Sequence, residues 1–277
     1  MTNLQQRIVT GTIFGVTLIG GILWSEYALT CIALFIIIVG SYELNNIFQK
    51  INIFPNKIFV FAGNISLFFA CLFFALFRDD LSFLGKEILL LFASFIGFYL
   101  LLFTIELFRN IEKSLENLGA VFFSAIYVAL PIGLLTISSV DNTGNYNGWR
   151  VLFFFFFMWA SDTGAYFSGR AFGKHKLFER LSPKKTIEGF IGGLITAGLV
   201  GIAAFYQLGT LPLWAWITTG IIMSITGTLG DLLESMLKRQ TGIKDSGTIL
   251  PGHGGILDRF DSTFFSAPVY WIILQLV

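Results

Sequence analysis

Long uncharged stretches divide this chain into segments of roughly the same length. A helix needs about 20 mainly apolar residues to cross a bilayer, and nine stretches that approach this length follow one another along the sequence. They cover residues 8–24, 28–47, 58–77, 88–108, 118–140, 151–167, 189–206, 213–229 and 260–277. The pattern predicts an all-α polytopic membrane protein with about nine transmembrane helices.

Three of the nine stretches depart from a purely apolar pattern. The second carries Glu43, the sixth carries Asp162, and the ninth begins inside a polar segment. Composition nevertheless supports a membrane protein, since 55% of the 277 residues are hydrophobic and 13% are charged, and mean hydropathy is +0.76. The net charge of +1 gives no global basic field, so we expect no nucleic-acid partner.

The distribution of Lys and Arg predicts the orientation of the helices. With nine spans, fifteen of the 18 Lys and Arg residues fall on the side that holds the N-terminus, while Arg78, Lys86 and Arg150 fall on the other. Cytoplasmic loops carry the excess of positive charge in membrane proteins. The sequence therefore places the N-terminus and the basic loop after the sixth span in the cytoplasm.

The two halves of the chain differ in their polar residues. Residues 1–149 form a region of transmembrane helices that we interpret as a scaffold with dimer contacts, and residues 150–277 form the region that carries chemistry. Polar residues of the first region, including Glu43 and Glu106, lie near predicted helix ends, where headgroup contact or snorkelling accounts for them. Without a long linker, we expect no separate soluble domain.

Two polar segments in the second half are candidate binding sites. An ionised Asp162 inside a span costs roughly 2.5–3.5 kcal/mol on insertion scales, so we expect it to be functional, with helix-end capping as the alternative. Ser182 and Pro183 suit the N-cap and first position of the seventh helix. Lys184 and Lys185 at that helix start suit a bound anion, and positive-inside anchoring is the alternative.

The stretch from Asp231 to Ser262 contains the densest polar residues. If the eighth helix continues past Gly230, four side chains share one face at i, i+3, i+4 and i+7; they are Asp231, Glu234, Ser235 and Lys238. Asp258 and Asp261 repeat the i, i+3 spacing at the start of the ninth helix. Carboxylates at two helix ends can hold Mg²⁺, so the candidate metal ligands are Asp231, Glu234, Asp258 and Asp261.

Glycines and basic residues lie between and beside these acids. Consecutive N–H groups in a glycine-rich loop can form an anion-binding concavity, and the candidates are Gly252, His253, Gly254 and Gly255. The positive charge that a polyphosphate needs is available from Lys238, Arg239, Lys244 and Arg259. The whole stretch is typical of metal-dependent phosphoryl transfer at a membrane surface.

Five sequence blocks resemble the phosphatidate cytidylyltransferases, also called CDP-diacylglycerol synthases. The blocks are SDTGAY at 161–166, SPKKTIEG at 182–189, SMLKR at 235–239, KDSG at 244–247 and LPGHGGILDRFD at 250–261. The resemblance implies a homodimeric multipass enzyme of the bacterial cytoplasmic membrane, with its active site facing the cytoplasm. Its substrates would be CTP and phosphatidate, and Asp231 and Asp258 would be the principal ligands of a two-cation centre holding Mg²⁺ and K⁺.

On this interpretation the catalytic candidates are Asp231, Asp258, Asp261, Lys238, Arg239 and Lys244. Substrate-binding candidates are Asp162, Ser182, Lys184, Lys185, Ser235, Gly252, His253, Gly254, Gly255 and Arg259. His253 bonds a phosphate or only shapes the glycine loop.

Three other functions stay open on the residues alone. A cation-coupled transporter would use the buried acids but leaves Lys184, Lys185, Lys238 and Arg239 without a role. A CTP-dependent transferase acting on a polyprenol or another lipid would differ only in its lipid-binding walls. A structural scaffold gives no reason for so many charges beside apolar spans.

Overall fold

A computed structural model describes residues 3–77, 84–109, 111–141, 143–249, 252 and 254–276. Almost all regular structure in these ranges is helical. The helices are α1 (Asn3–Trp24), α2 (Glu26–Lys50), α3 (Lys57–Phe77), α4 (Leu84–Phe108), α5 (Ser114–Ser124), the π-helical turn η1 (Ala125–Ala129), α6 (Leu130–Ile137), α7 (Gly148–Phe172), α8 (Ile187–Leu208), α9 (Leu213–Thr241) and α10 (Leu257–Leu276). Two short strands, β1 (Lys176–Phe178) and β2 (Ser182–Thr186), lie between α7 and α8.

Each stretch predicted to span the membrane is helical over most of its described residues. The fifth differs in detail, because α5, η1 and α6 follow one another along it instead of one uniform helix. Within the described residues, six helical segments are long and apolar enough to cross a bilayer: Glu26–Lys50, Lys57–Ala75, Ser114–Ile137, Gly148–Phe172, Ile187–Leu208 and Leu213–Thr241. The all-α polytopic class is confirmed, while the number of nine crossings stays a prediction.

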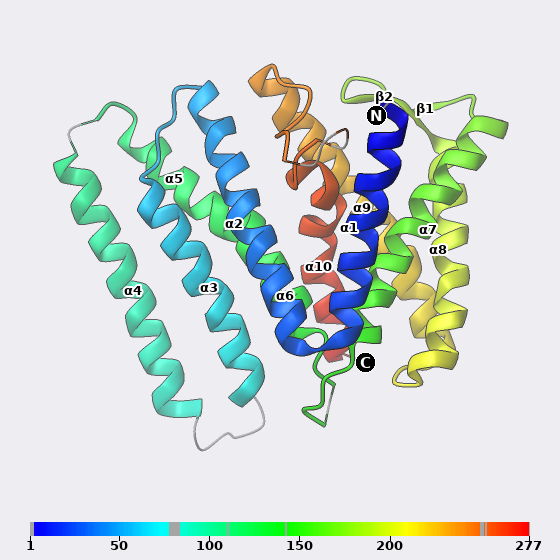
Figure 1. Cartoon of the computed structure of the whole chain (residues 1–277), viewed down its shortest axis with the longest axis horizontal. Helices are drawn as coiled ribbons and strands as arrows, with labels where there is room; N and C mark the ends of the chain where they lie inside the picture. The colour runs from blue at the N-terminus through cyan, green and yellow to red at the C-terminus, as the bar shows by residue number, and fades with distance from the viewer. Residues whose placement is uncertain are drawn as a thin grey trace.

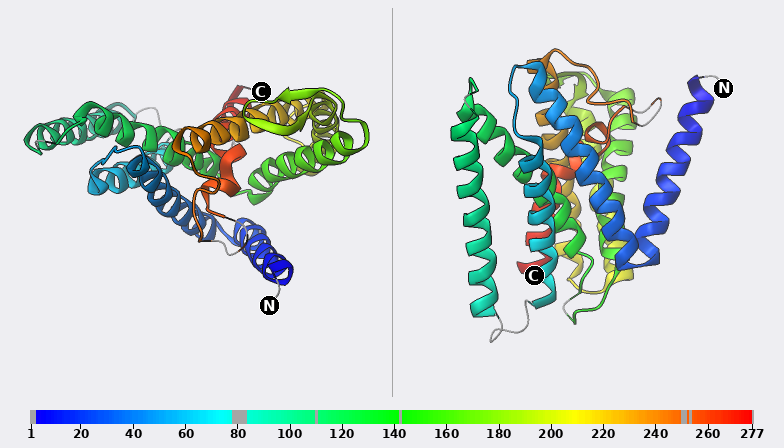
Figure 2. Two further views of the ribbon diagram at one scale, coloured as in Figure 1. Left: turned by 90° about the horizontal axis from the view of Figure 1, so that it is seen from above. Right: turned by 60° about the vertical axis from the view of Figure 1, so that its left-hand side comes forward.

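Most helices run roughly side by side between two opposite ends of the molecule, across its longest axis (Figures 1 and 2). The N-terminus, the β1–β2 hairpin and the segment joining α9 to α10 lie at one end, at the top of Figure 1. The C-terminus and the segment joining α6 to α7 lie at the other. We call the first the hairpin end, and it holds the polar segments that the sequence singled out.

The main hydrophobic core joins the two halves of the chain. Leu18, Ile37 and Ile132 belong to the same buried cluster as Phe157 and Phe264. A smaller buried cluster connects α3, α4 and α5 around Val60 and Leu102. The helices of residues 1–149 therefore pack directly against those of 150–277, and the functional division between these regions stays a prediction.

Glycines bring α7, α8 and α9 into close contact. A Cβ at Gly201 would lie 2.6 Å from the backbone carbon of Trp216 on α9, and one at Gly193 would lie 3.0 Å from the carbonyl oxygen of Ser161 on α7. Small residues let helix backbones approach closely within membranes. This packing places Asp162 of α7 and Asp231 of α9 near each other at the hairpin end.

The prediction that Ser182 caps the seventh helix is wrong. Residues Ser182–Thr186 form strand β2, which pairs antiparallel with β1. The helix begins after the hairpin, where Thr186 is the N-cap and its hydroxyl accepts a hydrogen bond from the Gly189 N–H at 3.1 Å. Because the strand pairing uses the extended backbone of residues 182–186, the first helical turn cannot start at Pro183.

Candidate active site

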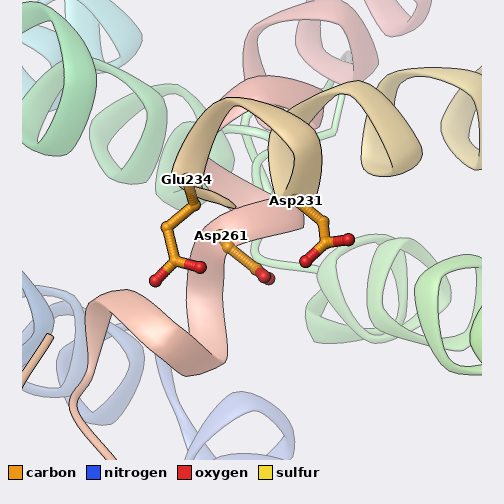
Figure 3. A group of neighbouring side chains, drawn as sticks. All are labelled: Asp231, Glu234 and Asp261. Carbon is orange, nitrogen blue, oxygen red and sulfur yellow. The ribbon is translucent and has the colours of Figure 1, made fainter. Parts of the chain in front are cut away.

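Three carboxylates from two helices meet at the hairpin end. Asp231 and Glu234 lie on α9 and Asp261 lies on α10, and one ligand oxygen from each lies within 4.8 Å of the others. Figure 3 shows the three side chains projecting to the same side of the contact between the helices. Helix α9 continues past Gly230 to Thr241, which was the condition for the common face, and the i, i+3 spacing therefore puts Asp231 and Glu234 on one face.

Gly230 explains why α9 and α10 come so close at this point. A Cβ at this position would lie 2.6 Å from the carbonyl oxygen of Asp261 and 3.0 Å from the Cα of Ser262. Any other residue would push the two helices apart. A glycine directly before Asp231 thus allows the carboxylates of the two helices to form one cluster.

The carboxylate cluster has the donor chemistry of a site for a hard divalent cation. Glu234 is only 3% exposed, and its Oε2 forms an ion pair with Lys238 Nζ at 2.5 Å. Its Oε1 is buried without a hydrogen-bond partner among the described residues. A buried, unsatisfied carboxylate oxygen is costly, and Mg²⁺ prefers such oxygens together with water and phosphate. The residues present therefore fit the predicted cation.

Asp258 lies beside this cluster in a different environment. Its Oδ1 accepts from Lys238 Nζ at 2.9 Å, and its Oδ2 accepts from the backbone N–H groups of Ser246 at 2.9 Å and Gly255 at 2.7 Å. Lys238 therefore links Asp258 to Glu234. The structure brings Asp231 and Asp258 into one site, but the close group of three carboxylates contains Asp261 and not Asp258. The metal role of Asp258 stays a prediction.

The glycine-rich segment before α10 holds the protein's own carboxylates. Gly252 and Gly254 have positive φ values of 77° and 83°, which suit glycine. The N–H of Gly255, however, donates to Asp258. Anion binding at Gly252, Gly254 and Gly255 stays a prediction, and at Gly255 an anion would compete with Asp258 for the N–H group. His253 lies outside the described residues.

A cavity of about 390 Å³ opens next to the carboxylates. Its lining combines polar and apolar side chains from α7, the hairpin, α8 and α9: Ser161, Asp162, Ala165, Tyr166, Gly169, Arg170, Leu177, Lys184, Lys185, Thr186, Gly189, Phe190 and Thr228. Lys185 forms an ion pair with Asp231. Three residues predicted to bind substrate, Asp162, Lys184 and Lys185, thus share one cavity, and Lys185 connects it to the carboxylate cluster.

The remaining predicted residues lie around this site with more solvent contact. Ser235 is half-buried on α9, while Arg239, Lys244 and Arg259 are exposed. Ser182 is half-buried on β2. Their segments lie at the hairpin end (Figure 1), and their contacts with substrate stay predictions.

The interpretation of Glu43 and Glu106 as headgroup or snorkelling contacts is wrong, because both side chains are buried. Glu43 on α2 is only 1% exposed, and its carboxylate accepts hydrogen bonds from Ile256 N at 3.0 Å, Leu257 N at 2.9 Å and Ser246 Oγ at 3.2 Å. The feature of the sequence that could have indicated these contacts of Glu43 was an acidic residue inside an apolar stretch.

Tyr127 is a second residue that sequence reasoning missed. Its side chain on η1 is 6% exposed, and its hydroxyl has no hydrogen-bond partner among the described residues. The hydroxyl is close enough to interact electrostatically with Glu234, Asp261 and Asp231. π-Helical turns often occur at functional sites, but no sequence pattern distinguished this one from ordinary helix.

This chain is similar in sequence to known cytidylyltransferases. A family model described as "Cytidylyltransferase family" matches residues 5–277. A phosphatidate cytidylyltransferase of Bacillus subtilis (strain 168) is 33% identical over 284 aligned residues, which cover 100% of this chain and 99% of the relative. Phosphatidate cytidylyltransferases of Staphylococcus haemolyticus (strain JCSC1435) and Staphylococcus aureus (strain COL) are 54% and 51% identical over 125 residues. Those two alignments span 45% of this chain and 48% of each relative, about half the length of those proteins.

Proposed function

Because this chain belongs to the cytidylyltransferase family, we propose that it joins CTP and phosphatidate into CDP-diacylglycerol and pyrophosphate. A phosphate oxygen of phosphatidate attacks the α-phosphorus of CTP. The bond from that phosphorus to the oxygen that bridges it to the β-phosphorus breaks, and pyrophosphate leaves with that oxygen. The observation that carries the proposal is the carboxylate cluster joined through the Lys185–Asp231 ion pair to a cavity lined by basic residues.

Both reactants are anions, so the site must reduce their repulsion before attack can occur. Asp231, Glu234 and Asp261 would hold Mg²⁺, with Asp258 as the further predicted ligand and K⁺ as the second cation. When bound, such cations neutralise phosphate charge and orient the reacting groups. The fit rests on the carboxylate donor set and on the unsatisfied Glu234 Oε1.

Basic side chains would make the remaining contacts with the phosphate groups of the two substrates. Lys184 and Lys185 line the cavity and would bind the phosphate of the lipid headgroup. Lys238 lies between Glu234 and Asp258, where it limits repulsion between the two acids and can contact the triphosphate. The exposed Arg239, Lys244 and Arg259 would contact pyrophosphate as it leaves.

The site lies at one end of a multipass membrane protein, where it can meet both substrates. CTP would arrive from the cytosol and phosphatidate from the adjoining leaflet. We therefore assign the hairpin end to the cytoplasmic face of a bacterial cytoplasmic membrane, in agreement with the excess of Lys and Arg predicted there. The homodimer implied by the family resemblance is part of this proposal and can be tested by cross-linking in native membranes.

A single assay tests the proposed reaction. Purified protein in detergent is incubated with labelled CTP, Mg²⁺ and phosphatidate, and the expected product is a labelled liponucleotide whose formation stops when EDTA is added. Parallel reactions replace phosphatidate by diacylglycerol, a polyprenol or a polyprenyl phosphate. No labelled lipid with phosphatidate, or faster labelling of another lipid, would contradict the proposal.

A further inference from the structure

Glu43 connects the first half of the chain to the segment that carries the acidic residues of α10. It lies on α2, more than 200 residues before its partners Ser246, Ile256 and Leu257. Both carboxylate oxygens are used, because Oε1 accepts from Ile256 N, and Oε2 accepts from Leu257 N and Ser246 Oγ. The side chain thus ties both ends of the segment 246–257 to α2.

The contacts explain how the start of α10 is stabilised. The first N–H groups of a helix have no partner within the helix, and a negative charge is favourable there. Leu257 is the first residue of α10, and Ile256 directly precedes it. Glu43 therefore acts as a cap supplied by another helix, and hydrogen bonds to an ionised acceptor are stronger than neutral ones.

Two glycines make room for the Glu43 carboxylate. A Cβ added at Gly247 or at Gly255 would collide with Glu43 side-chain atoms. The segment therefore lacks side chains at the two positions where Glu43 approaches it. This complementarity shows that the contact between α2 and the segment is a specific feature of the packing.

The first turns of α10 hold two candidate metal ligands. Asp258 accepts from the N–H groups of Ser246 and Gly255, residues at the two ends of the part of the chain that Glu43 holds. Asp261 follows one turn later in the carboxylate cluster. We propose that Glu43 is a positioning residue, which holds Ser246, Ile256 and Leu257 in place so that Asp258 and Asp261 face Glu234 and Lys238. The inference rests on the proposed function for its effect on catalysis.

Glu43→Gln tests this role with little change in volume. An amide has only one acceptor oxygen, and its NH₂ group would face a backbone N–H at whichever position it occupied. We expect kcat to fall roughly 10- to 100-fold, as for small displacements of reacting groups, and the Mg²⁺ concentration for half-maximal rate to rise. The KM for phosphatidate should stay unchanged, because Glu43 does not line the cavity.

Hydrogen–deuterium exchange measures the contact without any assay of activity. In the wild-type protein the amides of Ile256 and Leu257 donate to Glu43 and should exchange slowly. Glu43→Gln should accelerate exchange in peptides that contain these two residues. If the full-length wild-type protein shows no CTP turnover, the proposed function fails, and the exchange result still decides whether Glu43 holds the segment.

Glu106 provides a matched control for burial of an acid in the first half of the chain. It is 2% exposed and accepts hydrogen bonds from Arg109 Nη1 at 2.7 Å and Asn117 Nδ2 at 3.1 Å. Neither partner belongs to segment 246–257. Glu106→Gln should leave the Mg²⁺ dependence and the exchange of Ile256 and Leu257 unchanged.

Ser246→Ala keeps the proposal testable if Glu43→Gln does not fold. It removes only the hydroxyl that donates to Glu43 and leaves the Ser246 N–H that donates to Asp258. We expect changes of the same kind but smaller size. The positioning role is overturned if Glu43→Gln keeps wild-type kcat, Mg²⁺ dependence and exchange, or if Glu106→Gln changes all three equally.

Discussion

At the scale of single residues, Asp231 and Asp258 lie in the same candidate active site but have different surroundings. Asp231 pairs with Lys185 and belongs to the close carboxylate cluster. Asp258 binds Lys238 and two backbone N–H groups of the segment before α10. In the proposed mechanism both residues hold a cation, and Asp258 in addition holds the backbone around the site through its contacts with Ser246 and Gly255.

Asn substitutions at the two positions should therefore separate these contributions. We expect Asp231→Asn and Asp258→Asn each to lower kcat by more than about 100-fold, the upper range for residues that merely support metal ligands. Only Asp258→Asn should accelerate amide exchange at Ser246 and Gly255. Liponucleotide synthesis and hydrogen–deuterium exchange measure the two effects, and normal turnover in both variants would refute the metal roles.

Tyr127 poses a related question about a single hydroxyl. A buried hydroxyl without a partner costs free energy, yet here it lies near Glu234 and Asp261. Tyr127→Phe removes the hydroxyl and keeps the ring that packs against Phe264. If the hydroxyl donates to a bound phosphate or water, kcat should fall roughly tenfold, about 1.4 kcal/mol of barrier.

The stability of Tyr127→Phe provides the internal control. Because no protein hydrogen bond is lost among the described residues, the melting temperature in detergent should be unchanged or slightly higher. A large fall in melting temperature with proportional loss of activity would instead indicate a structural hydroxyl.

At the scale of elements, helix α8 depends on small residues where it crosses α9. A Cβ at Gly201 would lie 2.7 Å from the Cα of Ile217, a backbone atom that cannot move independently of α9. At Gly198, three residues earlier, the nearest atom would be the Ile221 Cγ1 at 3.6 Å, an ordinary contact. The two glycines thus lie on the same helix with different packing constraints.

Alanine substitutions should reveal this difference. Gly201→Ala should destabilise the protein by about 1–3 kcal/mol through overpacking, seen as a lower melting temperature in detergent. Gly198→Ala should be neutral or stabilising, since alanine favours helix over glycine by up to about 1 kcal/mol. Equal melting temperatures for both variants would show that α8 and α9 tolerate separation.

The elements also show which parts of the fold the sequence could predict. Long apolar stretches predicted the helices, because a membrane-spanning helix must satisfy its backbone polar groups internally over about 20 residues. The β1–β2 hairpin was missed, because Ser182 and Pro183 satisfy the local pattern of a helix start equally well. Residues 182–186 form a strand because they pair with Lys176–Phe178. Such pairing between two segments cannot be recognised from the pattern of either segment alone.

At the scale of the whole molecule, one part of the site follows from local sequence patterns and another part follows only from contacts between distant segments. The common face of Asp231, Glu234 and Lys238 follows from helical periodicity alone, and the structure contains the Glu234–Lys238 ion pair. Glu43 and Tyr127 reach the site only through the packing of α2 and η1 against α10. Their roles depend on contacts across more than 100 residues, which periodicity and spacing do not specify.

The arrangement of the chain ends and loops makes the orientation in the membrane testable. Figure 1 places the segment between α9 and α10 at the hairpin end and the segment between α6 and α7 at the opposite end. Thr248 and Thr143 are exposed representatives of these segments. If the hairpin end faces the cytoplasm, Thr143→Cys should react with a membrane-impermeant maleimide in intact cells. Thr248→Cys should react only after permeabilisation. The unsubstituted chain, with Cys31 and Cys71, gives the background, and the reverse labelling pattern would place the carboxylate cluster on the side that cytosolic CTP cannot reach.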